Sequence, residues 1–371
     1  MRTSFQPPRC LALAVIVAAC GHTVSDFPPP PTVGPAGTGA DVRLTFNPDQ
    51  DYWPSWTADG QGILYSFVSD TPGPQHRCVG LLPATGGTNI WQLCDNRATE
   101  ADSVNSFTAY ALAADGQLLY TEAVSTSGPQ SAAPGESTLW LADTAAPFQR
   151  RALLSLPTFV GGQSVTWLAD IDWTGPNAFI ALAQDFSLVV HCKGCAILDS
   201  TFAGLAVVRG TIGPSGATMT AVPGTDGASS YSMAENGASI VFTRFGEHVL
   251  YKIPAGGGTP VAVTTVTPAA ELLGVSCTAG VCVVADDPVV TGCDGCPLFS
   301  PSVAVPAELR AVTLATGSVQ VLLADTLTLV ATPKISPSGH DVVTQRGGLF
   351  GHVQTISLST ADLHLYLGLV P

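Results

Sequence analysis

The residues of this chain that suit acid–base chemistry are two pairs of carboxylates. Asp170 and Asp172 form the first pair, and Asp286 and Asp287 form the second. Paired carboxylates can move protons in catalysis or bind calcium. Neither pair has the Asp-x-Asp-x-Asp-Gly spacing of a calcium loop, and such pairs are common in acidic exported chains. We therefore expect solvated loop acids at both places, the second of them at the end of a strand.

Two Cys-x-x-Cys motifs suit redox chemistry or a shared zinc site of four thiolates. Cys192 and Cys195 form the first motif, and Cys293 and Cys296 form the second. Thioredoxin-type chemistry requires a helix that begins at the first cysteine, and no helical pattern follows either motif. Export of the chain, argued below, favours oxidised cysteines. The preferred interpretation is two structural disulfides, and zinc binding and redox chemistry stay open as alternatives.

Four further cysteines bracket short hairpins. Cys78 and Cys94 flank a Thr-Gly-Gly turn, which places them opposite one another at the open end of the hairpin. Cys277 and Cys282 flank a shorter turn. Both spacings predict local disulfides across neighbouring strands.

Motifs of common hydrolases and metalloenzymes are absent from the sequence. There is no Gly-x-Ser-x-Gly elbow, no His-Glu-x-x-His motif and no Gly-rich phosphate loop. The histidines are scattered, at positions 22, 76, 191, 248, 340, 352 and 364. The sequence therefore predicts no catalytic residue, no metal and no cofactor.

The elements that must position these residues repeat along the chain. An apolar strand, a turn with Asp-Gly, Asn-Gly or Ser-Gly in the better copies, and a second apolar strand recur at intervals of 44 to 61 residues. The turns begin at Trp56, Leu112, Trp173, Met233, Cys277 and Ile335. A second set of strands and small-residue turns lies downstream of most copies, so one unit has room for four strands.

Six such units predict an all-β fold, a six-bladed β-propeller of four-stranded antiparallel blades. One four-stranded sheet cannot bury both of its faces alone, so neighbouring blades must stack face to face. Two β-sandwich domains are the competing interpretation, but they do not predict a sixfold repeat of one turn.

Two copies carry a more specific pattern. In the first, Arg43-Leu44-Thr45 precedes a segment over residues 51–60 that reads Asp-Tyr-Trp-Pro-Ser-Trp-Thr-Ala-Asp-Gly. The fourth copy, over residues 232–244, is also a good match, whereas the third and fifth depart from the pattern. These copies resemble the TolB-like, or WD40-like PD40, propeller family. The resemblance implies a six-bladed propeller over residues 42–371 and transfers no catalytic residue, because the family motif is structural.

The N-terminus has the features of a secreted lipoprotein. Residues 1–19 contain Arg2, Arg9 and an uninterrupted apolar stretch at 11–19, which predicts a signal peptide. The small residues before Cys20 resemble a bacterial lipobox, which implies lipidation of Cys20; an ordinary signal peptide is the alternative. Gly21 favours the outer membrane. Residues 20–41, with four consecutive prolines, predict a tether.

The charge of the chain limits its partners. The formal net charge is −14, and loss of Arg2 and Arg9 with the signal peptide makes the mature chain more acidic. An acidic surface repels nucleic acid and anionic lipid. We expect no nucleic-acid partner, and contact with a membrane only through the lipid on Cys20.

Loops that precede the first strand of each blade gather around the central channel of a propeller, where they suit protein or glycan contacts. Their candidate residues are Asp51, Tyr52, Trp53, Phe107, Trp167, Asp170 and Tyr231. Alternatively, each aromatic residue caps its own blade. The sequence thus favours a non-catalytic binding scaffold of the bacterial cell envelope. The other possibility is an enzyme of the lyase, lactonase or glycosidase type, which requires acids, histidines or a metal to converge at the channel mouth.

Overall fold

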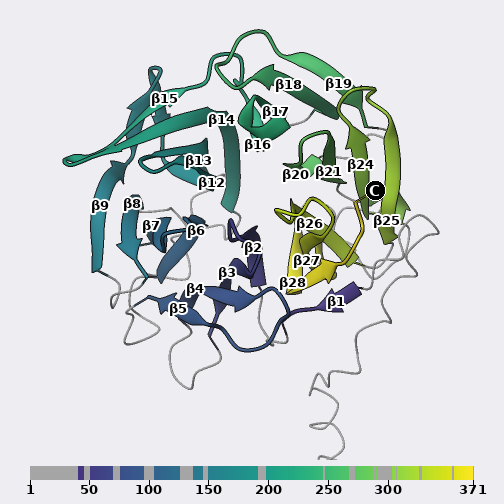
Figure 1. The fold of residues 1–371 in the computed structure, drawn as a ribbon, viewed down its shortest axis with the longest axis horizontal. Coiled ribbons are helices and arrows are strands. Elements are labelled where there is room, and N and C mark those ends of the chain that lie inside the picture. The colour runs from purple at the N-terminus through teal and green to yellow at the C-terminus, as the bar shows by residue number, and fades with distance from the viewer. Residues whose placement is uncertain are drawn as a thin grey trace, which may run out of the picture. The chain divides into compact units, whose positions relative to one another are not determined.

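Short runs rich in Val, Ile, Leu and Thr form the strands of this protein, as their β-propensity predicts. The computed structural model describes residues 41–45, 51–69, 76–95, 104–125, 137–144, 149–190, 198–244, 247–266, 272–286, 289–290, 303–305, 307–325, 328–352 and 355–370. All of them belong to one compact unit that spans residues 33–371. Within this unit, six four-stranded antiparallel sheets stand as blades around one axis (Figure 1). The predicted six-bladed β-propeller is confirmed.

The first four blades each take four strands in chain order. Blade 1 contains β2 (Asp51–Trp56), β3 (Gly62–Val68), β4 (Arg77–Pro83) and β5 (Trp91–Cys94). Blade 2 contains β6 (Val104–Leu112), β7 (Gln117–Ser125), β8 (Ser137–Asp143) and β9 (Gln149–Leu156). Blade 3 contains β12 (Trp167–Gly175), β13 (Ala178–Val190), β14 (Leu198–Gly213) and β15 (Gly216–Ala221). Blade 4 contains β16 (Ala228–Ala234), β17 (Ser239–Arg244), β18 (Val249–Pro254) and β19 (Val261–Thr265), with a short 3-10 turn at Glu235–Gly237.

The last two blades have different connections. Blade 5 contains β20 (Leu272–Cys277), β21 (Val281–Asp286), β24 (Ala307–Thr313) and β25 (Val319–Asp325). Blade 6 contains β26 (Thr328–Ile335), β27 (Val342–His352) and β28 (Thr355–Tyr366), and takes β1 (Asp41–Arg43) as its fourth strand. Two small hairpins lie outside the blades: β10 (Thr158–Val160) with β11 (Gln163–Val165), and β22 (Val289–Val290) with β23 (Val303–Val305).

Strand β1 closes the ring, because it joins the start of the described chain to the last blade. Asp41 pairs with Tyr366, and Arg43 pairs with His364. The Asp41 carboxylate lies 2.9 Å from Arg346 Nη1 and 2.7 Å from His364 Nδ1, and all three side chains are largely buried. The short strand is thus held by charge as well as by its ladder.

The core lies between blades, as face-to-face stacking requires. Six clusters of buried apolar residues each combine side chains from two neighbouring blades. Two predicted turn anchors also cross these interfaces. Trp56 Nε1 donates to the Lys334 carbonyl oxygen of blade 6 at 2.9 Å, and Trp173 Nε1 donates to the Ala111 carbonyl oxygen of blade 2 at 3.1 Å.

The acids of the repeated turn, Asp59 and Asp115, accept hydrogen bonds within their own turns. Asp59 accepts hydrogen bonds from Thr57 Oγ1 at 2.6 Å and from the Gln61 backbone N–H at 3.0 Å. These bonds, the Thr57 hydroxyl first, lower the pKa of Asp59. The following Gly60 has φ +69°, a conformation that glycine adopts without strain. Asp115 similarly accepts from the Gln117 N–H at 3.1 Å.

Two of the predicted disulfides are present in the described residues. Cys78 is bonded to Cys94 between β4 and β5, and Cys277 is bonded to Cys282 between β20 and β21. Each bond joins neighbouring strands of one blade, as the spacing of the cysteines predicts. Both predictions are confirmed.

The other cysteines for which the sequence makes a prediction lie outside the described residues. They are Cys20, the expected site of lipidation, and the two Cys-x-x-Cys motifs. Cys192 and Cys195 fall between β13 and β14 in the chain, and Cys293 and Cys296 fall between β21 and β24. Each motif therefore follows the second strand of its blade in the chain. The structure contains no disulfide in its described part for either motif, so the bonds Cys192–Cys195 and Cys293–Cys296 stay predictions.

Removal of the Cys78–Cys94 bond should cost more stability than removal of Cys277–Cys282. The chain-entropy model gives about 3 kcal/mol for the first loop and about 2 kcal/mol for the second, because the sequence separations are 16 and 5 residues. Urea unfolding of the two Cys→Ala double variants measures the difference. Equal losses in the free energy of unfolding would show that loop entropy does not determine how much each disulfide contributes to stability.

Candidate functional site

The innermost strand of every blade is interrupted at the same level. The breaks in register fall between Tyr52 and Ser55, Phe107 and Ala109, Ala169 and Ile171, Ala228 and Ser230, Leu272 and Gly274, and Ala331 and Lys334. Such bulges turn side chains away from the regular alternation of a strand. Six of them at one level around a common axis re-aim a ring of side chains toward the channel.

Three bulges contain residues in the left-handed region of backbone space. Trp53 has φ +50°, Asp170 has φ +55° and Thr332 has φ +48°. This conformation is unfavourable for large and β-branched residues, and Trp53 and Thr332 also precede Pro54 and Pro333, which restrict them further. Strain of this kind persists only where the surroundings impose it, and it concentrates at functional sites.

Neighbouring blades hold the strained backbone in place. The Tyr110 hydroxyl of blade 2 lies 3.0 Å from the Tyr52 carbonyl oxygen and 2.6 Å from that of Trp53. Burial raises the pKa of Tyr110 well above its ordinary value, so this hydroxyl stays a donor. Thr108 Oγ1 likewise lies 3.0 Å from the Leu168 carbonyl oxygen of blade 3. The bulges therefore form a rigid collar.

A cavity of about 300 Å³ lies inside this collar. All six blades line it, and each contributes the residue three positions before its turn anchor. These residues are Trp53, Ala109, Asp170, Ser230, Gly274 and Thr332. The volume is at the lower end of the range of small-molecule sites.

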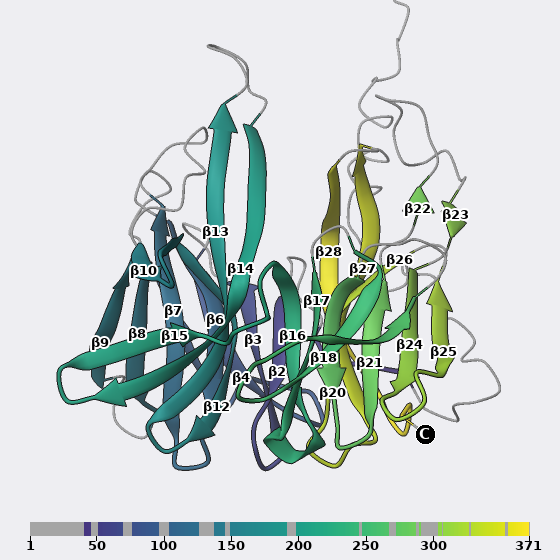
Figure 2. The ribbon, with the colours of Figure 1, turned by 90° about the horizontal axis from the view of Figure 1, so that it is seen from above.

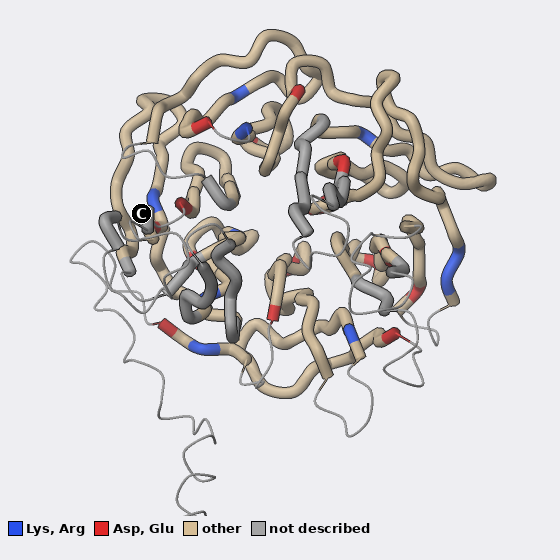
Figure 3. The backbone as a smooth tube through the Cα atoms, turned by 180° about the vertical axis from the view of Figure 1, so that it is seen from behind, with Lys and Arg blue, Asp and Glu red and all other residues tan. Residues whose placement is uncertain are grey.

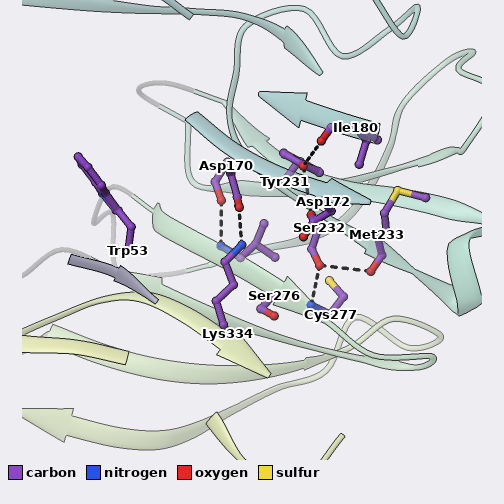
Figure 4. Close-up of polar contacts among 12 residues, drawn as sticks. Trp53, Asp170, Asp172, Ile180, Tyr231, Ser232, Met233, Ser276, Cys277 and Lys334 are labelled. Carbon is purple, nitrogen blue, oxygen red and sulfur yellow. Dashed lines mark hydrogen bonds and ion pairs between the residues drawn. The ribbon is translucent and has the colours of Figure 1, made fainter. Parts of the chain in front are cut away.

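One ion pair crosses the channel. Asp170 belongs to β12 of blade 3 and Lys334 to β26 of blade 6, and these blades stand opposite one another in a ring of six. Lys334 Nζ lies 2.5 Å from Asp170 Oδ2, and the two side chains point toward each other across the axis (Figure 4). Burial works against the charge of Lys334, but the nearby carboxylates Asp170 and Asp172 raise its pKa overall. Lys334 is therefore a cation at neutral pH.

Asp172, the other carboxylate of the pair with Asp170, has a different environment. Burial, and then the negative charge of Asp170, raise the pKa of Asp172, while Lys334 and Tyr231 partly offset this rise. The Tyr231 hydroxyl lies 3.1 Å from Asp172 Oδ2 and 3.0 Å from the Ile180 carbonyl oxygen (Figure 4). Asp170, in contrast, has a lysine as its direct partner.

Several polar groups at the cavity have unused hydrogen-bonding capacity among the described residues. The Gln184 side chain lines the cavity and is only 7% exposed. Thr332 Oγ1 is buried and has no hydrogen-bond partner among the described residues. Lys334 Nζ has three donors but contacts one described partner, and Asp170 Oδ1 has none. Buried polar groups are almost always paired, so the Thr332 hydroxyl needs a partner from a ligand or from water. Lys334 and Asp170 are 18% and 27% exposed, so their remaining donors and acceptor can meet a ligand in the cavity.

The structure distributes the loop candidates of the sequence over two environments. Trp53 is 40% exposed at the cavity, and Trp167 and Asp170 line it while partly buried. Tyr52 is half-buried beside Trp53, with ring centroids 5.5 Å apart. The buried residues are Asp51, Phe107 and Tyr231. None of these three lines the cavity, and Phe107 and Tyr231 belong to the apolar clusters between blades.

The expectation of solvated loop acids is wrong for Asp170, Asp172 and Asp286. Asp170 and Asp172 lie within β12, where the ion pair and burial hold them. Asp286 ends β21, as predicted, but it is fully buried beside Arg310, with Oδ2 3.1 Å from Nε. Burial raises the pKa of Asp286 to about 6, even though Arg310 opposes the rise. Asp287 lies outside the described residues.

Sequence reasoning missed Lys334, Gln184 and Thr332. A signal for Thr332 was available, because the position three residues before each turn anchor lines the cavity in every copy. Lys334 follows two positions later. Gln184 had no comparable signal, since its place depends on the pairing of β13 with β12, where it lies opposite Trp167.

The described part of the chain contains neither a group of metal-binding side chains nor a cluster of basic residues. Among the residues described, no group of three or more His, Cys, Asp or Glu side chains has the arrangement of a metal site. Lys and Arg residues of the described backbone are scattered around the ring and form no patch (Figure 3). The described chain contains no helix that is long and apolar enough to cross a membrane.

Comparison with known proteins supports the fold. No family model matches the sequence, and no curated protein matches it either. Among solved structures, a gluconolactonase from Xanthomonas campestris is 13% identical, with 90% of each chain covered and a TM-score of 0.52. A luciferin-regenerating enzyme is 9% identical over 89% of this chain and 95% of its own, with a TM-score of 0.49. The WD40 repeats of RRP9 are also 9% identical, over 88% and 97%, with a TM-score of 0.47. At such identities the first likeness establishes the β-propeller fold and nothing about activity.

Proposed function

We propose that this protein is a lipid-anchored, TolB-like binding scaffold of the bacterial cell envelope that receives its ligand at the channel mouth without catalysis. The observation that carries the proposal is the cavity inside the collar of bulges. Thr332 Oγ1 lacks a partner among the described residues, Lys334 Nζ and Asp170 Oδ1 have hydrogen-bonding capacity to spare, and the backbone of the bulges is held in a strained conformation. Backbone strain of this kind concentrates at functional sites, including sites that hold ligands. The strained bulges therefore favour a ligand-binding role for the cavity.

The ligand of this scaffold is an envelope glycan or an envelope protein. Aromatic and polar side chains at the cavity suit either class. Titration of the purified protein with solubilised glycan and protein fractions of the envelope, followed by tryptophan fluorescence, tests the proposal. We expect one fraction to change the fluorescence of the wild type and not of Lys334→Met. The matched control is Lys252→Met, which removes a lysine paired with Glu235 away from the channel. No response to either fraction, or an equal response in all three proteins, would refute a channel site.

Anchoring through Cys20 gives a separate prediction. The small residues before Cys20 favour lipidation, and disulfides at Cys78–Cys94 and Cys277–Cys282 fit an oxidising compartment. In a bacterial host, the wild type should incorporate labelled palmitate and sediment with outer membranes. Cys20→Ser should lose both properties. Release of the wild type as a soluble, unlabelled protein would contradict the proposal.

A second candidate function is catalysis at the same place. The specific observation in its favour is the pair Asp170 and Asp172, because one acid contacts a lysine while burial raises the pKa of the other. Two neighbouring carboxyl groups in different environments can divide the roles of base and acid. Asp172 does not line the cavity, however, which is why binding ranks first. Turnover of a sugar lactone or glycoside that Asp172→Asn abolishes would decide for catalysis.

A further inference from the structure

We infer that the channel cavity binds a neutral saccharide, with Lys334 and Asp170 holding two adjacent hydroxyl groups and Trp53 covering one face of the sugar ring. The inference rests on the proposed function, because it names the chemical class of the ligand for that site. Of the two ligand classes that suit the cavity, glycan and protein, the observations below favour a glycan.

The charges of the cavity favour a neutral ligand. Asp170 and Lys334 are its charged lining residues, and they already neutralise one another at 2.5 Å. A carboxylate that joined Lys334 would be repelled by Asp170 and Asp172, and an ammonium group on Asp170 would be repelled by Lys334. Either arrangement places an unbalanced charge in a site that is partly shielded from water, which is costly.

The free N–H donors of Lys334 and the free acceptor of Asp170 lie side by side, which suits a ligand with adjacent hydroxyl groups. Lys334 Nζ offers further N–H donors, and Asp170 Oδ1 offers an acceptor directly beside them. A hydroxyl group both donates and accepts. Two adjacent hydroxyls can therefore accept from Lys334 and donate to Asp170 while the ion pair stays intact. Hydrogen bonds to charged groups are also stronger than neutral ones.

Two further groups provide a second observation in favour of a hydroxyl-rich ligand. Gln184 is more than nine-tenths buried, and its amide side chain lines the cavity. Thr332 Oγ1 is a buried hydroxyl with no hydrogen-bond partner among the described residues. An amide and a hydroxyl pair equally well with sugar hydroxyls, and neither group adds charge. A largely apolar ligand would leave the Thr332 hydroxyl unsatisfied, at a cost in binding free energy.

Aromatic side chains complete the site. Trp53 is the most exposed aromatic residue of the cavity lining and lies next to Tyr52 at the rim. An indole has an apolar face and one polar edge, which matches a sugar ring with its apolar C–H face and peripheral hydroxyls.

The β13–β14 hairpin extends beyond the start of β12. Gln184 pairs with Trp167, the first residue of β12, and β13 continues for six residues past Gln184 (Figure 2).

The size of the cavity argues against an extended peptide. Six residues of extended chain span about 20 Å, which requires a groove, whereas the site is a single cavity of about 300 Å³. The cavity instead fits one compact ring. The blades also fix Lys334 and Asp170 from opposite sides, so little order must be gained on binding.

Isothermal titration with the methyl glycosides of glucose, mannose and galactose tests the inference on the full-length protein. We expect at least one of them to bind, and its deoxy analogue that lacks one of the two adjacent hydroxyls to bind at least about tenfold more weakly. Glucuronate and glucosamine, which add a charge, should also bind at least about tenfold more weakly. This comparison needs only the wild type and does not depend on variants that fold poorly.

Variants then place the sugar in the cavity. Lys334→Met and Asp170→Asn should weaken binding at least about tenfold, while Lys252→Met should leave it unchanged. Tighter binding of the charged sugars, or equal binding by both lysine variants, would overturn the inference. If no sugar binds but an envelope protein fraction binds in a Lys334-dependent manner, the saccharide inference fails and the proposed function stands. If neither binds, both fail.

Discussion

Asp41→Ala should lower the free energy of unfolding by about 3–5 kcal/mol, the cost of breaking a buried ion pair. Asp41 is the shared partner of Arg346 and His364, at 2.9 Å and 2.7 Å, and its side chain is only 5% exposed. Removal of the Asp41 carboxylate takes one charged partner from the buried guanidinium of Arg346. It also loosens β1, the three-residue strand that closes the ring. For a domain of this size the loss corresponds to a fall in melting temperature of roughly 5 °C.

Urea unfolding followed by tryptophan fluorescence measures this loss without the salt effect of guanidinium. Asp115→Ala is the matched control, because it removes an exposed carboxylate that accepts from one backbone N–H in a turn. The control should lose about 1 kcal/mol or less. Similar losses for the two variants would mean that the charged contacts of β1 do not close the propeller.

Lys334→Met should destabilise the protein by about 2 kcal/mol at pH 7, less than Asp41→Ala because Asp170 is 27% exposed. The loss should also depend on pH. The raised pKa of Asp172 makes the folded state hold its proton more tightly than the unfolded state does. Its stabilising contribution is therefore present in acid and is lost as the pH rises through that pKa. Without Lys334 the stability lost on ionisation of Asp172 should be larger. The difference in free energy of unfolding between Lys334→Met and the wild type should therefore increase from pH 4 to pH 7.

A double-mutant cycle with Asp170→Asn isolates the coupling across the channel. The double variant should be more stable than the sum of the two single losses predicts, because neither charge then lacks its partner. Strict additivity, or a difference from the wild type that decreases as the pH rises, would show that the ion pair does not connect the opposite blades.

The repeat explains why the fold was predictable. Turn residues such as Asp59 and Gly60 act locally, through contacts within a few residues, so each copy carries its own signal. Six copies then fix the number of blades. Cys78 with Cys94 and Cys277 with Cys282 were predictable for the same reason, because each pair closes one hairpin.

The site was less predictable because its contacts are distant in the chain. Asp170 and Lys334 are 164 residues apart, and Asp41 and His364 are 323 apart. No local pattern joins such residues; only closure of a ring of six blades brings them together. Their acidic and basic side chains look like ordinary surface charges until the opposite blades are identified. The bulges were also hidden, except for the prolines at positions 54 and 333 at equivalent places in two copies.

A crystal structure of the full chain soaked with the tightest-binding methyl glycoside would show whether the channel cavity holds a saccharide. We expect one sugar ring inside the collar of bulges, with adjacent hydroxyls within hydrogen-bond distance of Lys334 Nζ and Asp170 Oδ1 and with Trp53 against its face. A sugar bound elsewhere on the propeller, or an empty channel at saturating sugar, would contradict this expectation.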